Sequence, residues 1–228
     1  MILTKDQDII LATLARHKIA KRFYWTGGTL LAHYYFQHRK SFDLDFFTDT
    51  PFLRDELDAF LLDVTKVLGG NPLTERKIYD RWEFILPKLD VPVRFEFVHY
   101  NHEKKRLAPL IPYRGLLIDS LSDISANKTM AYLDRNQPKD ALDIYWILKK
   151  RKFTVRKLLS LIAEKFNVNI TEFTFWSESV KALKQFDSLK PYLLETNVEK
   201  QEEFLRKVTY FFLDHGKDFL TEKLGGVK

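Results

Sequence analysis

Apolar and polar residues alternate in short runs through the first half of the chain and recur at helical spacing between those runs. Phe42, Leu44 and Phe46 take every second position, which is typical of a strand with one buried face. Ile10 and Leu14 are spaced like one face of a helix. The pattern predicts, in chain order, a helix at about 4–17, a strand at 23–25, a helix at 30–37, a strand at 42–47, a helix at 53–68, a hairpin of 77–87 with 92–99 around Leu89-Asp90, and a strand at 115–118.

The second half of the chain has the pattern of successive helices. Pro138 suits the first position of a helix, where its missing N–H costs nothing. Helices are predicted at about 120–134, 138–150, 154–167, 171–185 and 198–223. The sequence therefore predicts an α+β fold, with a mixed sheet flanked by helices in residues 1–118 and a C-terminal helical domain in residues 119–228.

Charge and composition narrow the class of protein only a little. The 228 residues contain 37 Lys and Arg against 31 Asp and Glu, a formal net charge of +6, which suits a phosphate-rich partner without requiring one. The absence of cysteine excludes disulfides, thiolate metal sites and a cysteine nucleophile. No apolar run approaches the roughly 20 residues that span a bilayer, and the N-terminus lacks a signal-peptide pattern. We expect a soluble, cytoplasmic protein without a membrane segment.

Two aspartates share the polar face of the strand at 42–47. Asp43 and Asp45 point to one side, because successive side chains of a strand alternate between faces. Two neighbouring carboxylates repel each other, and a divalent cation such as Mg²⁺ removes that cost by using the same oxygens as ligands. An ordinary half-exposed strand is the alternative interpretation of Asp43 and Asp45.

A double glycine precedes this strand by one predicted helix. Gly27 and Gly28 allow a phosphate or another backbone to approach closely, and Thr29 adds a hydroxyl. The N-terminus of the helix that follows offers unpaired N–H groups to an anion. A double glycine alone often marks only a turn. The turn, helix and strand together bring a phosphate-binding segment towards the two aspartates.

Glu96 is a third acid with the same placement, between Phe95 and Phe97 on the polar face of a predicted strand. It is able to complete a metal site with Asp43 and Asp45. A salt bridge to Arg94 or another basic residue is the alternative role.

Lys128 lies on or beside the apolar stripe of its helix, since Ile124 and Tyr132 flank it at helical spacing. An inward lysine needs an anionic partner, and a nucleotide triphosphate or a carboxylate cluster would supply one. A lysine whose stem packs while its head reaches water is the alternative. Asp140, in the first turn after Pro138, would stabilise the helix dipole in any case.

Two blocks of the chain resemble the signature of the AbiEii/AbiGii-type nucleotidyltransferases, toxin components of type IV toxin–antitoxin and phage-defence systems in the DNA polymerase β-like nucleotidyltransferase superfamily. The first joins GGT at 27–29 to HRKSFDLDFF at 38–47; the second is DISANK at 123–128 with RNQPKDALDIY at 135–145. Fourteen residues, 29–42, separate Gly28 from Asp43, about one more than the pattern expects. The resemblance covers about residues 20–150, and nothing after about 152 carries it.

The resemblance implies a polymerase-β-like sheet and metal-dependent transfer of a nucleoside monophosphate from an NTP, with Mg²⁺ or Mn²⁺ as cofactor and pyrophosphate as leaving group. It assigns Asp43, Asp45 and Glu96 as catalytic metal ligands. It adds Lys128 and Asp140 as catalytic residues from the helical domain, which would contribute to the active-site cleft. The nucleotide-binding residues it implies are Gly27, Gly28, Thr29, Lys128 and Asp143. Arg39, just before the strand at 42–47, is a further candidate for nucleotide binding, with an ion pair to an aspartate as its alternative role.

The resemblance also implies tRNA or another RNA as acceptor and a cognate antitoxin as partner. The basic runs KKR at 104–106 and KKRK at 149–152 are either an electrostatic contact for RNA or simply solvated faces. A small-molecule or protein acceptor is the alternative activity, and a nucleotide- or antitoxin-binding module without catalysis is the alternative class. The sequence does not indicate an oligomeric state.

Overall fold

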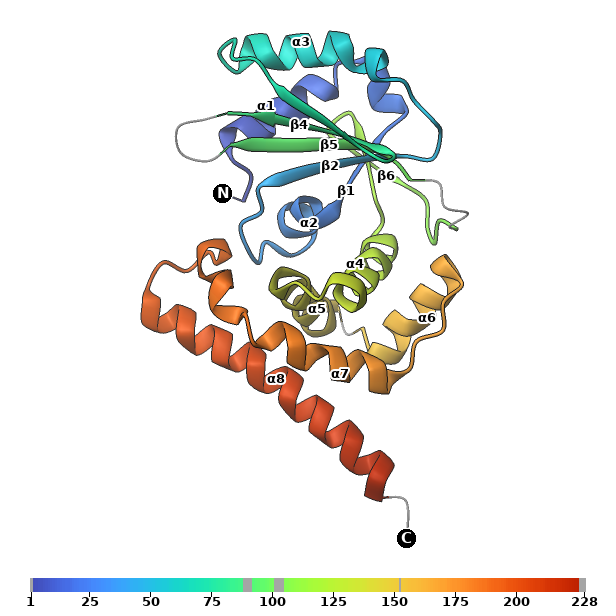
Figure 1. Ribbon diagram of the computed structural model, residues 1–228, viewed down its shortest axis with the longest axis vertical. Coiled ribbons are helices and arrows are strands. Elements are labelled where there is room, and N and C mark those ends of the chain that lie inside the picture. The colour runs from blue at the N-terminus through green and yellow to red at the C-terminus, as the bar shows by residue number, and fades with distance from the viewer. Residues whose placement is uncertain (1, 88–91, 101–104, 152, 226–228) are drawn as a thin grey trace. The chain divides into compact units, whose positions relative to one another are not determined.

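The computed structural model describes residues 2–87, 92–100, 105–151 and 153–225. By contacts the chain divides into two compact units, one of residues 1–104 with 108–121 and one of residues 105–107 with 122–228. The first unit contains a sheet with helices, and the second is built from helices (Figure 1).

A seven-stranded sheet forms the first unit, in the spatial order β3-β4-β5-β2-β1-β7-β6. The pairs β2–β5 and β1–β7 are parallel and the other neighbours are antiparallel. The predicted α+β fold with a mixed sheet is thereby confirmed. The strands are β1 (Tyr24–Thr26), β2 (Asp43–Thr48), β3 (Thr74–Ile78), β4 (Arg81–Leu86), β5 (Val93–His99), β6 (Ile111–Tyr113) and β7 (Leu116–Ile118).

One face of the sheet is an aromatic core. Phe46 of β2 stacks on Phe97 of β5 with ring centroids 5.1 Å apart, and Phe60 of α3 (Asp58–Val67) meets Phe97 edge-to-face at 5.6 Å. All three rings are fully buried. Helix α1 (Lys5–Leu14) packs beside α3 on the same side of the sheet (Figure 1). Because side chains alternate along a strand, the residues next to Phe46 in β2 and next to Phe97 in β5 face the opposite side of the sheet.

The helix predicted at 30–37 begins earlier and changes type. Its first turn is α2 (Gly27–Leu30), and residues Leu31–Phe36 (η2) continue it as a π-helix that ends at Gln37, whose φ is +52°. The Gln37 amide donates to the carbonyl oxygen of Ala32, five residues back, at 2.8 Å. The remaining short helices of this unit are the 3₁₀ segments η1 (Lys18–Lys21) and η3 (Arg54–Leu57), the latter leading into α3.

The single strand predicted at 77–87 is wrong, since the chain forms two strands here. β3 and β4 pair around Tyr79 and Asp80, and Tyr79 takes a φ of +50°. β3 is an exposed edge strand of sequence TERKI, so it has no buried face to produce an apolar alternation. Antiparallel pairing of β4 with β5 confirms the predicted hairpin partners, while its turn at Leu89-Asp90 lies outside the described residues.

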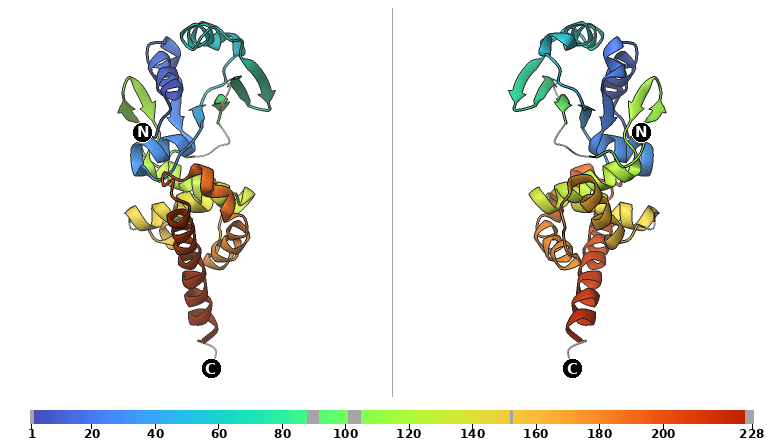
Figure 2. Two further views of the ribbon diagram at one scale, coloured as in Figure 1. Left: turned by 90° about the vertical axis from the view of Figure 1, so that its left-hand side faces the viewer. Right: turned by 90° about the vertical axis from the view of Figure 1, so that its right-hand side faces the viewer.

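The helical unit consists of helices close to those predicted, with one 3₁₀ segment that was not. Thr154 and Thr171 cap two of them, each accepting from the amide three residues on at 3.1 Å. Figure 2 shows α8 extending beyond the shorter helices of its unit. The elements are α4 (Leu121–Arg135), α5 (Pro138–Arg151), α6 (Val155–Phe166), α7 (Glu172–Leu183), η4 (Phe186–Tyr192) and α8 (Val198–Gly225).

Two buried polar contacts fix α4 within the helical unit. The Tyr132 hydroxyl donates to the carbonyl oxygen of Phe175 in α7 at 2.9 Å. Lys165 of α6 lies 2.5 Å from the carboxylate of Asp123, and both side chains are buried. Within the described residues, no helix combines the length and apolar composition that crossing a membrane requires.

Candidate functional site

The glycine turn lies against the acidic strand. β1 runs directly into α2 at Gly27, which has a φ of +78°, a conformation that favours glycine. A Cβ atom at residue 27 would overlap Oδ2 of Asp45. Thr26 and Asp45 are direct partners in the β1–β2 ladder. The carboxylate of Asp45 therefore occupies space that is open only because residue 27 has no side chain.

Replacing Gly27 with alanine is expected to destabilise the protein and displace the Asp45 carboxylate. The left-handed backbone alone costs an alanine about 1–2 kcal/mol, and the steric overlap with Asp45 adds to this. Gly70→Ala is the matched control, because Gly70 has a φ of +76° and nothing lies within 4 Å of an added Cβ. Urea unfolding gives the loss of unfolding free energy in each variant, and the difference between the two losses is the effect of the contact with Asp45. Equal losses would contradict a steric contact between residue 27 and Asp45.

The Thr29 side chain makes hydrogen bonds within the fold. Its side chain is buried, and its hydroxyl hydrogen-bonds to the Ser41 hydroxyl at 2.8 Å and to the carbonyl oxygen of Asp43. These contacts hold the first turn of the helix to the start of β2. Gly27 and Gly28 remain partly exposed.

The predicted acids lie side by side on the polar face of the sheet. Asp45 of β2 is the direct partner of Glu96 in the parallel neighbour β5. Glu96 in turn is the direct partner of Glu83 in β4. Asp43 lies two residues before Asp45 on the same face of β2, opposite Arg94. The structure thus brings Asp43, Asp45 and Glu96 together, beside the glycine turn.

Two arginines bind carboxylates of this acidic face. Arg94 donates to both carboxylate oxygens of Asp43, at 3.1 and 3.2 Å, and to Glu83 at 3.0 Å. Arg81 lies 3.4 Å from Glu96. Burial acts to lower the pKa of Arg94, but Asp43 and the neighbouring carboxylates outweigh it and hold that pKa above its usual value. Among the residues that the structure describes, no three acidic or histidine side chains converge as a ready-made metal cage.

A second charged cluster lies in the helical unit. The Lys128 ammonium is 3.2 Å from Asp140 and 2.8 Å from Asp143, and both carboxylates are fully buried. Arg135 binds Asp140 with two nitrogens, at 2.7 and 2.9 Å. Burial acts to raise the pKa of Asp140, but Lys128 and then Arg135 outweigh it, so that pKa lies below its usual value. The inward lysine predicted for α4 therefore has carboxylate partners from α5.

Arg39, the remaining predicted nucleotide contact, has a buried side chain. One of its terminal nitrogens donates to the carbonyl oxygen of Lys40 at 2.9 Å.

Comparison with known families identifies the chain. The model of the family described as "Nucleotidyl transferase AbiEii toxin, Type IV TA system" matches residues 9–214. The chain belongs to the AbiEii toxin family. The match extends well past residue 152, so the helical unit is part of the family pattern even where no motif in it was evident from the sequence.

Relatives of this AbiEii-family chain cover nearly its whole length. An uncharacterised protein of Aquifex aeolicus, aq_aa25, is 26% identical over 218 residues, spanning 93% of this chain and 98% of its own. Two Helicobacter pylori crystal structures, each 18% identical, share the fold. One, named a "putative nucleotidyltransferase", has a TM-score of 0.59 over 97% of this chain and 99% of its own. The other, JHP933, has a TM-score of 0.56 over 98% and 95%.

Glu83 is an acid of this AbiEii-family chain that the sequence did not single out. Its side chain is only 4% exposed, and it joins the row of carboxylates through its pairing with Glu96. Its place follows from the β4–β5 register, so counting residues outward from the hairpin predicted around Leu89-Asp90 would have paired it with Glu96. Its ion pair with Arg94 links β4 to the arginine that holds Asp43.

Glu96 has an unusual protonation equilibrium. Burial, and then the adjacent Asp45 carboxylate, raises the pKa of Glu96 to about 7, against the opposing effect of Arg81 and Arg94. A carboxyl group whose pKa lies near the working pH is suited to proton exchange.

The raised pKa of Glu96 predicts a loss of stability as the pH rises. The folded value lies above the unfolded one of about 4.5, so the folded state binds the extra proton between these values. This contribution is complete below about pH 4.5 and is lost by about pH 7, up to about 3 kcal/mol. Urea unfolding of the metal-free protein from pH 4.5 to 8 measures it. Glu96→Gln should flatten this component, and an unchanged pH profile in Glu96→Gln would argue against the shift.

Proposed function

We propose that this toxin is a metal-dependent nucleotidyltransferase that moves a nucleoside monophosphate from an NTP to an acceptor hydroxyl, with RNA such as tRNA as the acceptor. The observation that carries the proposal is the contact of the Gly27 turn with Asp45, in register with Glu96 on the parallel neighbour strand. This places exposed main chain suited to phosphate beside two carboxylates suited to a cation.

The acidic face fits a divalent cation in donor chemistry. Asp43, Asp45 and Glu96 offer only carboxylate oxygens, which Mg²⁺ and Mn²⁺ prefer. Repulsion from Asp45 helps to raise the pKa of Glu96, so charge on this face is not fully compensated by the two arginines. Two bound divalent cations would supply Lewis-acid chemistry. They would lower the pKa of the acceptor hydroxyl and neutralise charge on the triphosphate. Asp43 would have to leave Arg94 to serve as a ligand.

The main chain and the side chains of this site then have distinct roles in the proposed reaction. The main chain at Gly27 and Gly28 binds the terminal phosphates, while Thr29 holds that turn to β2. Glu96 accepts the proton of the acceptor hydroxyl while the hydroxyl oxygen forms a bond to the α-phosphorus of the NTP. The bond from the α-phosphorus to its bridging oxygen breaks, and pyrophosphate departs with that oxygen. Lys128, oriented by Asp140 and Asp143, and Arg39 contribute positive charge for the nucleotide.

Removing Arg94 is expected to tighten metal binding. Arg94→Gln deletes the cation that holds both oxygens of Asp43, so Mn²⁺ affinity should rise roughly threefold to tenfold, a partly exposed ion pair being worth about 1 kcal/mol. Titration followed by electron paramagnetic resonance of free Mn²⁺ measures this without any turnover.

Arg76→Gln is the control for this measurement, because Arg76 lies on the exposed edge strand, 3.6 Å from Glu83, with a side chain that is 61% exposed. Its Mn²⁺ affinity should stay within about twofold of the original, the range expected for an exposed pair. An unchanged or weaker affinity in Arg94→Gln would show that Arg94 and the metal do not compete for Asp43.

The direct test of the reaction is incubation of purified protein and Mg²⁺ with each α-labelled NTP and total RNA. A labelled RNA band is the expected product. Label in protein or in a small molecule, with none in RNA, would support the alternative acceptors. Absence of any transfer, with NTP binding retained, would support the non-catalytic binding module instead.

Membership of a type IV toxin family implies an antitoxin partner. We place the reaction in the cytoplasm, where NTPs and tRNA are available, and propose growth inhibition during phage infection as its consequence. Induction of the protein with and without its neighbouring gene tests the toxicity.

A further inference from the structure

The helical unit contains a cavity of about 520 Å³, within the size range of small-molecule sites. It lies where α5 ends and α6 begins, and residues of α7 and α8 complete its wall. Three aromatic side chains line it: Phe153, Trp176 and Phe211. All the residues that line it belong to the helical unit.

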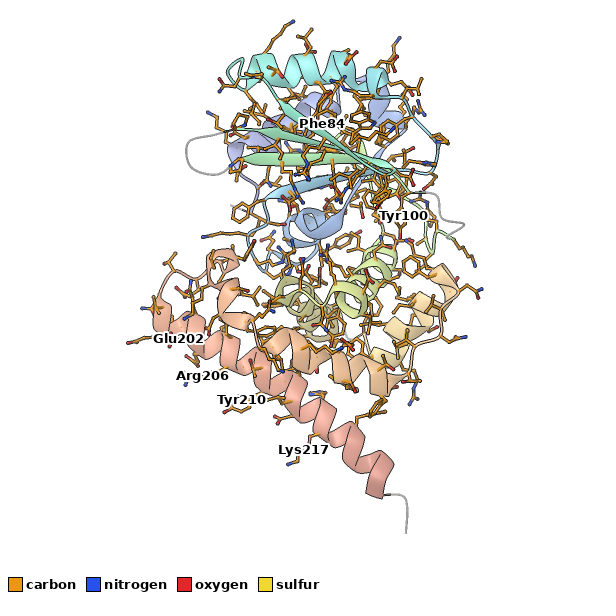
Figure 3. The ribbon with its side chains drawn as sticks, in the orientation of Figure 1. Phe84, Tyr100, Glu202, Arg206, Tyr210 and Lys217 are labelled. Atoms are coloured by element: carbon orange, nitrogen blue, oxygen red, sulfur yellow. The ribbon has the colours of Figure 1, made fainter. Side chains whose placement is uncertain are left out.

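The aromatic wall is ordered by helix geometry. Phe211 and His215 are one turn apart on α8, with ring centroids 4.3 Å apart, and Trp176 of α7 stacks on His215 at 5.9 Å. Nδ1 of His215 donates to the carbonyl oxygen of Phe211 at 2.8 Å, which leaves Nε2 as the ring nitrogen for a ligand. Tyr210, the residue before Phe211, points away from the body of the unit (Figure 3). These contacts form a platform suited to a flat ring.

Two basic side chains border this platform. The Lys149 ammonium lies 4.9 Å from the centre of the Phe211 ring, and Arg156 is a second basic residue in the wall. Glu172, an acid in the wall, is bound by Arg156 at 3.3 Å. Lys149 begins the basic run KKRK, of which Lys152 lies outside the described residues; Lys150 packs over Trp146 at 5.4 Å. The combination selects for a ligand that is both flat and anionic.

We propose that this cavity binds one nucleotide unit, with the base against Phe211, His215 and Trp176 and a phosphate beside Lys149. Aromatic rings combined with cations are the means by which proteins bind unpaired nucleotides without strict sequence preference. The same chemistry belongs to a residue of single-stranded RNA and to a free nucleotide. The RNA form of this inference rests on the proposed function, since it would hold part of the acceptor strand.

The test is a binding measurement on the full chain in EDTA, without NTP, using a fluorescein-labelled ten-nucleotide single-stranded RNA and, separately, AMP by calorimetry. Lys149→Ala and Phe211→Leu should each weaken binding roughly tenfold, as loss of a stacking or phosphate contact does. Arg206→Ala is the matched control, because Arg206 points outward from α8 (Figure 3). Its affinity should change less than about twofold.

Each outcome has a defined meaning. If Lys149→Ala and Phe211→Leu weaken RNA binding alone, the ligand is an RNA strand. If they weaken AMP binding, the ligand is a free nucleotide. Either result supports the proposal that the cavity binds a nucleotide unit. Absence of binding, equal weakening by Arg206→Ala, or displacement of RNA by poly-glutamate at equal charge would overturn it. Lys149 is exposed, so Lys149→Ala keeps the test valid if Phe211→Leu unfolds. Asp45→Asn should retain binding, so a failure of nucleotidyl transfer is distinguishable from a failure of this site.

Discussion

Asp45→Asn is expected to reduce nucleotidyl transfer by roughly 10³-fold or more while leaving the fold intact. Asparagine keeps the shape that fits against Gly27, but it removes the charge that binds a cation. The same change removes the carboxylate that helps to raise the pKa of Glu96. That pKa should therefore fall towards its ordinary value, and the free energy of unfolding at pH 7 should stay equal or increase.

The measurement pairs the labelled-NTP assay with urea unfolding of the same preparations. Asp55→Asn is the matched control, because Asp55 is an exposed aspartate of the same unit outside the acidic face. It should keep full activity and stability. Transfer by Asp45→Asn at the original rate would remove Asp45 from the site.

Lys128→Ala is expected to destabilise the helical unit by about 3–5 kcal/mol, the usual cost of leaving buried charges without their partner. Asp140 would keep Arg135, but Asp143 would lose an ammonium 2.8 Å away. Lys128→Met combined with Asp143→Asn should recover part of the loss, because it removes the charge as well as the partner.

Lys181→Ala provides the comparison at the surface of the same unit. Lys181 pairs with Glu178 at 2.6 Å, but its side chain is 67% exposed, and pairs of this kind contribute at most about 1 kcal/mol. Urea unfolding of the variants, followed by circular dichroism, gives the ranking. A loss for Lys128→Ala as small as that for Lys181→Ala would show that water reaches Asp143.

Periodicity located the elements that bury one face and missed those that do not. β2 and β5 were predicted because their phenylalanines alternate towards the core. β3 was missed because TERKI is exposed on both faces as an edge strand, and its hairpin turn at Tyr79 has no glycine or asparagine to mark it. The helices predicted after residue 119 lie close to their observed bounds, and Pro138 marks the start of one of them.

The charged contacts were less predictable, because they depend on register between strands far apart in the chain. The sequence offered Arg94 as an alternative partner for Glu96, whereas Arg94 binds Asp43 and Glu83 and it is Arg81 that lies beside Glu96. The roles assigned to Arg39, Lys128, Asp140 and the other site residues stay predictions until the variants are measured.

The π-helical segment at Leu31–Phe36 has a consequence for how this chain would tolerate a change in length before β2. In an α-helix one additional residue rotates everything after it by about 100°, which would turn the Asp43 strand out of register. In a π-helical turn such as the one closed by the hydrogen bond from the Gln37 amide to the Ala32 carbonyl oxygen, the additional residue is contained within the turn. The residues after the turn then keep their direction. A change of one residue in this segment would then be taken up before it reaches the sheet, and the register of Asp43 with Arg94 would be kept.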